Sequence, residues 1–181
     1  MEERKIYHPI QKDSVTFLQT AADIGGAYSL AEVELAPGGG VGLHYHKTYS
    51  EKFNCLEGEV QIGIGKKILP LLPGGTLTAE PNINHQFRNR SKRPCKFRVE
   101  IRPASRSFEQ SLQIGYGPAR DGACRKNGFP KDKLALAWLL DISESNLPER
   151  RRIFESILRR QAKKAVKQGT NKVLMEKYVK F

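Results

Sequence analysis

Long apolar runs are absent from this sequence of 181 residues. The longest largely apolar stretch, Leu134–Leu140, is far shorter than the roughly 20 residues that a transmembrane helix needs. The N-terminus is charged from its second residue and lacks the apolar core of a signal peptide, so nothing in it targets export. Cysteine is scarce, and Cys55, Cys95 and Cys124 show no CxxC spacing. We therefore expect a reduced, cytoplasmic protein.

Acidic residues are also under-represented, which leaves a net charge of +12. The segment 147–181 holds eleven Lys/Arg and three Glu and so carries +8 of that charge. The sequence has no internal repeat and no helix-turn-helix, and we do not expect it to bind nucleic acid. Two interpretations stay open for the basic tail: a solvated helix face whose apolar side packs on the protein, which we favour, or a peripheral contact with an anionic membrane.

Up to Pro103 the chain consists of short segments in which apolar and polar residues alternate, and Gly and Pro turns separate them. Clear examples are Ser14–Gln19, Ala27–Leu35 and Cys95–Arg102, in which Phe97, Val99 and Ile101 would share one face. Many short strands joined in this way are typical of an all-β sandwich or a closed barrel.

Histidine is scarce as well, with four residues in the chain, yet two of them lie close together. His44 and His46 are two apart, so an extended backbone would place both imidazoles on one face. Glu51 is an odd number of residues past His46, and along one continuous strand such a step would point its side chain to the opposite face. We therefore expect the chain to turn within Lys47–Ser50. After that turn Glu51, Phe53 and Cys55 share a face, and Glu51 lies beside the histidines on an adjacent strand.

A second segment brings the third histidine of interest. After the Gly74-Gly75 turn and the break PNIN, His85, Phe87 and Asn89 alternate onto one face. His8, by contrast, lies in a polar N-terminal arm with no neighbour of ligand type, and we assign it no role.

The two segments together resemble the motifs of the cupin family. The first motif, Gly-x5-His-x-His-x3–4-Glu-x6-Gly, is matched at every step by Gly38, His44, His46, Glu51 and Gly58. The second, Gly-x5-Pro-x-Gly-x2-His-x3-Asn, is matched by Gly74, His85 and Asn89, with Glu80 in place of proline and Asn82 in place of glycine. Because asparagine tolerates positive φ better than most residues, we expect Asn82 to make the same turn.

The resemblance implies a mainly β fold, the cupin-type double-stranded β-helix or jelly-roll barrel, followed by C-terminal helices. We expect an N-terminal arm and first strand over 1–24, the barrel over 25–103 and a basic helical extension over 104–181. It also implies a metal site formed by His44, His46, Glu51 and His85. Phe53 and Phe87 would line the substrate pocket, with Cys55 deeper.

Three imidazoles and one carboxylate without a thiolate suit a divalent transition metal. We favour iron or manganese, with nickel, cobalt and zinc as alternatives. The resemblance implies a metal-dependent, dioxygenase-like enzyme that acts on a small oxygen-rich molecule, and isomerase or decarboxylase chemistry is the alternative within enzymes. A non-catalytic module that binds or senses a small molecule is the competing class. Catalytic residues other than the metal ligands are not identified, and we expect a homodimer.

Helical patterns follow Pro103. We expect a short helix over Phe108–Ile114, stopped by Gly115 and Gly117-Pro118, and an amphipathic helix over Lys133–Ser143. Asn146 and Glu149 form a predicted capping pair for a further helix that extends to about Gly169. Its apolar stripe would pack on the barrel or on a partner subunit, and it consists of Ile153, Phe154, Ile157, Leu158, Ala162, Ala165 and Val166.

Overall fold

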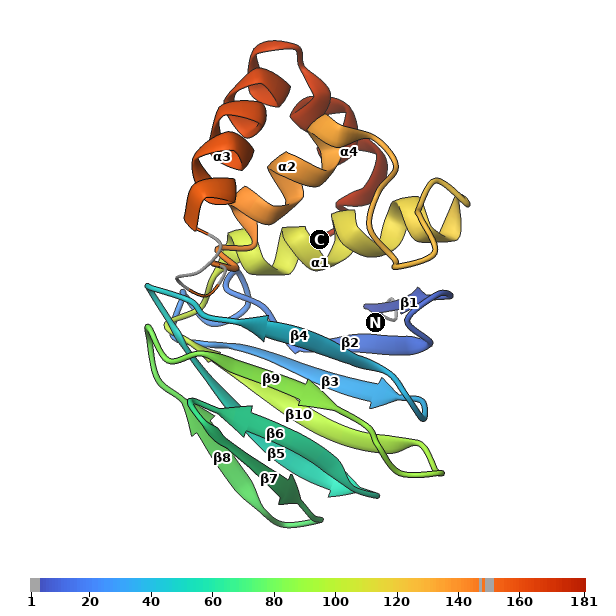
Figure 1. The fold of residues 1–181 in the computed structure, drawn as a ribbon, viewed down its shortest axis with the longest axis vertical. Coiled ribbons are helices and arrows are strands. Elements are labelled where there is room, and N and C mark those ends of the chain that lie inside the picture. The colour runs from blue at the N-terminus through green and yellow to red at the C-terminus, as the bar shows by residue number, and fades with distance from the viewer. Residues whose placement is uncertain (1–3, 147, 149–151) are drawn as a thin grey trace.

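The structure is a computed structural model that describes residues 4–146, 148 and 152–181. The fold is mainly β, with a jelly-roll barrel formed by two antiparallel sheets and a group of helices above it (Figure 1). The strands are β1 (Lys5–His8), β2 (Asp13–Gln19), β3 (Ser29–Leu35), β4 (Gly40–His44), β5 (Ser50–Glu57), β6 (Val60–Ile64), β7 (Lys67–Leu71), β8 (Thr76–Ala79), β9 (His85–Arg88) and β10 (Cys95–Arg102). The helices are α1 (Arg106–Arg120), α2 (Lys133–Ile142), α3 (Arg152–Lys167) and α4 (Thr170–Tyr178).

The two sheets enclose one apolar core. One sheet has the order β1-β2-β3-β10-β5-β8 and the other the order β4-β9-β6-β7. In β10 the predicted alternation is confirmed, because Phe97, Val99 and Ile101 are buried while Arg98 and Arg102 are exposed. Apolar residues at every second position of a strand give the barrel its inner face.

The turn between β8 and β9 follows the sequence prediction. Asn82 has a φ of 66°, so it adopts the left-handed conformation in place of the usual glycine. Its backbone N–H donates to the carbonyl oxygen of His46 at 2.6 Å. Glu80, in place of the usual proline, is exposed. The turn therefore forms with both substitutions, and it connects the segment that carries His85 to the segment that carries His46.

Two elements differ from the sequence prediction. Residues of the N-terminal arm form β1, which pairs with β2, and His8 is buried at its end. Helix α1 does not stop at Gly115 but runs to Arg120 and contains Pro118 in its last turn. Gly and Pro lower helix stability locally, but burial of α1 between the barrel and the other helices outweighs that preference.

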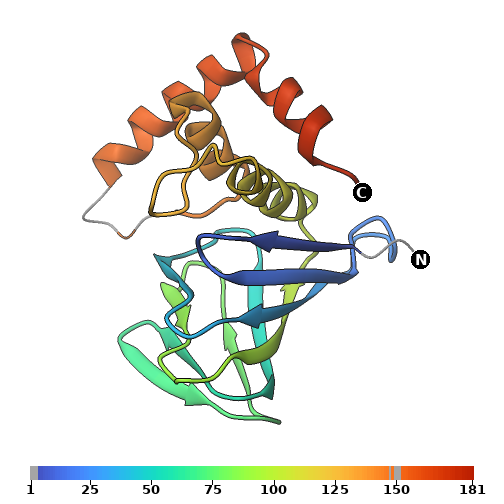
Figure 2. The ribbon, with the colours of Figure 1, turned by 90° about the vertical axis from the view of Figure 1, so that its right-hand side faces the viewer.

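Helix α1 is the layer between the barrel and the remaining helices (Figures 1 and 2). Phe108, Leu112 and Tyr116, spaced by four residues, pack on the barrel core. Ile114 belongs instead to a second apolar cluster among the helices, with members from α2, α3 and α4. The second cluster is completed by Ala135, Trp138, Leu139, Ala165, Leu174 and Tyr178.

Helix α3 packs mainly on α2 and α4. Among its described side chains Ala162 and Ala165 are buried, whereas Ile157 and Val166 are about half exposed, so within this chain the described part of the stripe packs over a narrower width than predicted. The side chains of Ile153 and Phe154 lie outside the described residues, as does Glu149. The side chain of Asn146 donates to the backbone carbonyls of Tyr45 and Glu144, and the helix start that it is predicted to cap lies outside the described residues.

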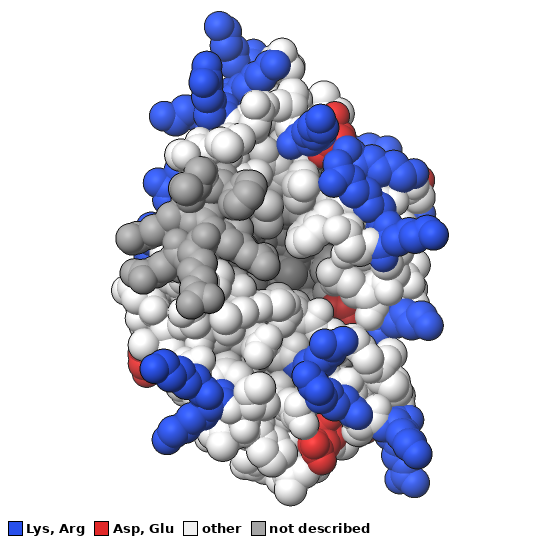
Figure 3. Space-filling model, in the orientation of Figure 1, with Lys and Arg blue, Asp and Glu red and all other residues white. Residues whose placement is uncertain are grey.

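Basic side chains are spread over the surface. On the face shown in Figure 3, Lys and Arg lie over both the helices and the barrel, with uncharged surface between them. On this face the described basic side chains form several separate groups, and both interpretations of the basic tail stay predictions. Within the described residues, no helix combines the length and apolar character needed to cross a bilayer. The homodimer stays a prediction.

Two glycines of α1 give a matched test of the helix packing. A Cβ at Gly117 would overlap the ring of Tyr178, whereas a Cβ at Gly115 would make ordinary contacts with Leu139 at 3.6 Å. We expect Gly117→Ala to lower the free energy of unfolding by about 1–3 kcal/mol through overpacking. Gly115→Ala should leave it unchanged or raise it by up to about 1 kcal/mol, because alanine favours helix. Urea unfolding measures both, and equal stability of the two variants would contradict the packing of α4 on α1.

Candidate metal centre

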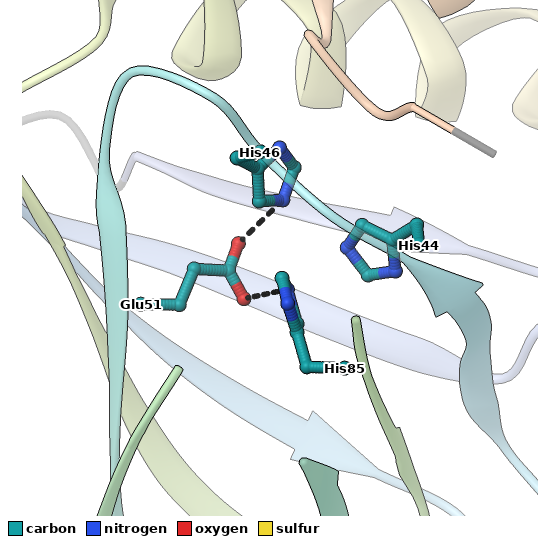
Figure 4. A group of neighbouring side chains, drawn as sticks. All are labelled: His44, His46, Glu51 and His85. Carbon is teal, nitrogen blue, oxygen red and sulfur yellow. Dashed lines mark ion pairs between the residues drawn. The ribbon is translucent and has the colours of Figure 1, made fainter. Parts of the chain in front are cut away.

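Four buried side chains of ligand type meet at one end of the barrel: His44, His46, Glu51 and His85 (Figure 4). His44 ends β4 and His85 begins β9, and these two residues are paired in the sheet. Glu51 comes from β5 of the other sheet, and His46 from the segment between β4 and β5. The cluster therefore joins both sheets. Glu51 lies beside the histidines as predicted, but its strand belongs to the opposite sheet and is not adjacent to β4.

The ligand atoms of the four residues all lie within 4.8 Å of one another. Glu51 lies between two of the histidines, with 3.2 Å from its Oε1 to His46 Nε2 and 3.3 Å from its Oε2 to His85 Nε2. Metal–ligand bonds to nitrogen and oxygen are about 2.0–2.2 Å, so donors on opposite sides of one ion lie roughly 4.2 Å apart. The cluster has nearly the size that one ion requires.

The other ring nitrogen of each histidine faces a backbone carbonyl oxygen. His44 Nδ1 lies 2.8 Å from Gly42 O, His85 Nδ1 lies 2.9 Å from Ile83 O, and His46 Nδ1 lies 3.2 Å from Glu144 O. A carbonyl oxygen can only accept, so Nδ1 carries the proton in each ring. A neutral ring with its proton on Nδ1 presents the Nε2 lone pair to the cluster, which is the arrangement of metal-binding histidines.

A cation would satisfy these lone pairs, whereas in the metal-free cluster they face other hydrogen-bond acceptors. Among the described residues, the buried Nε2 atoms of His46 and His85 have no hydrogen bond of good geometry. Each faces a carboxylate oxygen of Glu51, so lone pair would oppose lone pair unless a proton or a cation lies between them. The cluster could therefore hold a metal ion, and the donor set is that of a divalent transition metal.

In the metal-free cluster the carboxylate and the neighbouring rings shift one another's pKa values. Burial lowers the pKa of His44 to about 4, so this ring is neutral at pH 7. Burial acts to raise the pKa of Glu51, but hydrogen bonds and charge interactions with His46 and His85 outweigh burial and lower that pKa. The same interactions with Glu51 raise the pKa of His85 against the effect of its burial. Glu51 is thus an anionic donor among imidazoles.

Residues 143–146, which directly follow α2, lie against the cluster. Besides Glu144, whose carbonyl oxygen faces His46, Ser143 accepts a hydrogen bond of 3.1 Å from the hydroxyl of Tyr49. The Tyr49 ring is stacked on His46, with 4.3 Å between ring centroids. Asn146 and Tyr45 exchange backbone hydrogen bonds of 2.9 and 3.1 Å. The helical extension therefore helps to orient one of the candidate ligands.

A cavity of about 140 Å³ lies against the cluster. Its wall includes His44, His46 and Glu51, and most of the remaining wall is apolar. Phe87 lines it as expected. Phe53 and Cys55 are fully buried in the barrel core and are not among the lining residues that the structure describes, so the pocket differs from the predicted one. The apolar walls come from both the barrel and α1: Val15, Ala31, Val33, Val41, Phe87, Val99, Phe108 and Leu112.

Comparison with known proteins identifies the domain. Residues 31–101 match the family model described as a cupin domain. The barrel is therefore a cupin domain with a cluster that could hold a metal ion. No curated protein matches the sequence.

Solved structures of cupins are similar to part of the chain. A predicted oxalate decarboxylase from Thermotoga maritima is 25% identical over 51% of this chain and 81% of that chain, with a TM-score of 0.48. A sugar phosphate isomerase of the cupin superfamily from Silicibacter pomeroyi is 24% identical over 57% of this chain and 73% of that chain, with a TM-score of 0.48. The cupin domain of an XRE family transcriptional regulator from Enterobacter cloacae is 23% identical over 50% of this chain and 95% of that chain, with a TM-score of 0.45.

Sequence reasoning missed several residues around the cluster. Tyr49 and Glu144 contact His46, and Asp13 and Tyr116 line the cavity. Only Tyr49 had a sequence signal, because it lies in the predicted turn between two ligands. The other three come from segments outside both motifs: Asp13 lies on β2, whereas packing of the helices on the barrel brings in Tyr116 and Glu144.

Proposed function

We propose that His44, His46, Glu51 and His85 bind one divalent transition metal, and that the domain is a metal-dependent, dioxygenase-like enzyme acting on a small oxygen-rich molecule. One observation carries the proposal: three of the four candidate ligands form part of the wall of the cavity. A molecule in that cavity would lie directly beside the metal site. A site with a purely structural metal has no need of such a cavity.

The donor set favours iron or manganese. Neutral imidazoles and one carboxylate suit several divalent transition metals, and a six-coordinate ion would keep two positions for other ligands. Bound there, the metal would supply Lewis-acid polarisation of a substrate oxygen and, if it is redox-active, electron transfer with dioxygen.

The residues of the chain set the environment of that chemistry. Phe108 and Leu112 of α1 pack over the barrel, and together with the apolar strand residues they exclude water from the cavity. Glu51 leaves the site of a divalent ion with a net charge of +1, so an anionic or readily ionised oxygen group is the preferred partner. Both features match a small molecule with an apolar body and an oxygen donor at one end.

The test is a metal and substrate panel on the full-length, untagged protein. Samples loaded with iron(II), manganese, nickel, cobalt or zinc are incubated with diketones, catechols and hydroxy acids, and oxygen uptake and products are measured. The control is the double variant His44→Ala/His46→Ala, treated in the same way to subtract oxidation by free metal. We expect metal-dependent turnover by the unmodified protein alone.

Two results would change the conclusion. Product formation without oxygen uptake would move the enzyme class to isomerase or decarboxylase. Metal binding without turnover of any compound would favour the alternative, a non-catalytic module that binds or senses a small molecule.

A further inference from the structure

The histidines of the cluster are oriented by carbonyl groups of two different origins. His44 Nδ1 and His85 Nδ1 each face a carbonyl oxygen that lies two residues earlier in the chain. His46 Nδ1 instead faces the carbonyl oxygen of Glu144, which is 98 positions away in the helical extension. The barrel alone therefore orients two of the candidate ligands. The third also depends on how residues 143–146, the docking segment, lie against it.

The docking segment is attached at both of its ends to residues 45–49, the ligand loop that carries His46. At one end the carbonyl oxygen of Ser143 accepts a hydrogen bond from the hydroxyl of Tyr49. At the other end Asn146 and Tyr45 form an isolated antiparallel bridge with two backbone hydrogen bonds. The helical extension and the ligand loop are therefore connected by directional contacts on both sides of the imidazole.

Glu144 lies in the middle of the docking segment and has an unusual backbone conformation. Its φ is 51°, in the left-handed region that residues with a Cβ rarely adopt. A residue in this conformation often ends a helix, but it is usually glycine. Here the glutamate is used in two further contacts: its carboxylate accepts from the hydroxyl of Thr48, and its carbonyl oxygen faces His46 Nδ1 at 3.2 Å.

The same carbonyl oxygen is also held from the other side. Asn146 Nδ2 donates to it at 2.7 Å. Strained residues persist where the surrounding contacts hold them, and they are concentrated at functional sites. The conformation of Glu144 therefore directs a fixed acceptor at one of the candidate metal ligands.

We propose that Glu144 is a positioning residue for His46, and that docking of residues 143–146 is coupled to metal binding. In the docked segment the Glu144 carbonyl holds the proton on Nδ1 of His46 and so directs the Nε2 lone pair to the ion. Coupling between two equilibria is reciprocal, so a bound ion stabilises the docked segment by the factor by which docking raises the metal affinity. The helical extension thereby regulates the metal site.

This inference rests on the proposed function in one respect, the binding of a metal by the cluster, and not on the reaction. Loss of a group that orients a metal ligand typically lowers metal affinity by about 10–100-fold. Local opening of the docking segment removes such a group from His46. By reciprocity, saturating metal should make this opening at least about ten-fold rarer.

Amide hydrogen exchange on the unmodified full-length protein measures the opening directly. The probe ion is zinc(II), which has no redox chemistry and a filled d shell, so it leaves the NMR signals sharp. The reporter is the backbone N–H of Asn146, which donates to the carbonyl oxygen of Tyr45 at 2.9 Å. We expect its exchange to slow by about ten-fold or more at saturating zinc.

A second isolated bridge in the helical layer supplies the control. Cys124 and Pro130 pair in the same way as Tyr45 and Asn146, and beside them the N–H of Arg125 donates to a carbonyl oxygen at 2.8 Å. Within the described residues, no hydrogen bond joins this loop to the ligand loop. Zinc should leave the local exchange of Arg125 unchanged.

Two variants of Glu144 test the role of its backbone conformation. Glu144→Gly and Glu144→Val both remove the carboxylate that contacts Thr48, but glycine adopts a positive φ readily and a β-branched residue does so very rarely. The left-handed conformation costs a residue with a Cβ the equivalent of about 5–30-fold in population. A smaller docked fraction raises the apparent dissociation constant in proportion. We therefore expect zinc to bind Glu144→Val at least about five-fold more weakly than Glu144→Gly.

Competition with a chromophoric chelator measures both zinc affinities. A merely structural role of Glu144 would lower the melting temperature of Glu144→Val and leave the two affinities equal, and that result would overturn the positioning role. The exchange experiment needs no variant, so it decides the matter even if Glu144→Val does not fold.

The outcomes separate this proposal from the proposed function. Zinc binding with unchanged exchange at Asn146, or with equal slowing at Arg125, would overturn the coupling and leave the metal centre standing. Absence of zinc binding would remove both. Slowed exchange at Asn146 alone would support the coupling even if the metal-loaded protein turned over no compound.

Discussion

Replacing His46 with alanine is expected to abolish stoichiometric metal binding while the barrel stays folded. Loss of groups that merely orient a ligand typically lowers metal affinity by about 10–100-fold, so loss of a direct ligand should lower it by at least about 100-fold. The fold should persist because the barrel core is formed by apolar residues of both sheets and not by the cluster. Elemental analysis and circular dichroism on the same samples measure the two effects.

His8 provides the matched control for this experiment. It is a histidine with 2% exposure, like His46, but it lies outside the cluster and contacts Tyr116 and Gly128. His8→Ala should lower the melting temperature and leave the metal content unchanged. Unchanged metal in the His46 variant, or an equal loss in the His8 variant, would show that the cluster does not bind metal as assigned.

Replacing Glu51 with glutamine should have the largest effect on the chemistry. Glu51 is the only anionic donor, and glutamine nearly preserves its shape while it returns the site of a divalent ion from +1 to +2. We expect metal affinity to fall by about 10–100-fold. The metal that remains should attract anions more strongly but lose its redox tuning, so turnover should fall more than substrate affinity.

The comparison requires samples with matched metal content. Oxygen uptake and substrate binding are measured on iron-loaded preparations of both proteins, with Glu57→Gln as the control. Glu57→Gln is the same chemical change on the same strand. The Glu57 side chain, however, is exposed and lies near Lys96. Equal oxygen uptake by Glu51→Gln and the unmodified protein at matched iron would remove Glu51 from the chemistry.

The candidate site was predictable where it depends on local periodicity. The two-residue step from His44 to His46, the turn before Glu51 and the positive φ of Asn82 are properties of single strands and turns. The cupin resemblance added His85, whose strand pairs with that of His44. These features required no knowledge of how the helices pack.

The parts that could not be predicted depend on contacts between distant segments. Tyr116 reaches Asp13 across 103 positions of the sequence, and Glu144 reaches His46 across 98. No periodic pattern in either segment encodes such a contact. Gly117 illustrates the same limit, because it reads as a helix stop but is buried in α1 against Tyr178. Local propensity is a weak guide where tertiary packing decides.

The metal content of the unmodified protein tests the central claim most directly. The full-length chain, purified without a histidine tag or chelator and equilibrated with iron(II) or manganese, is separated from free metal and analysed for its elements. The cluster predicts about one transition-metal ion per chain, absent from the double variant His44→Ala/His46→Ala. A metal content no higher than that of the double variant would contradict the metal centre and the function proposed from it.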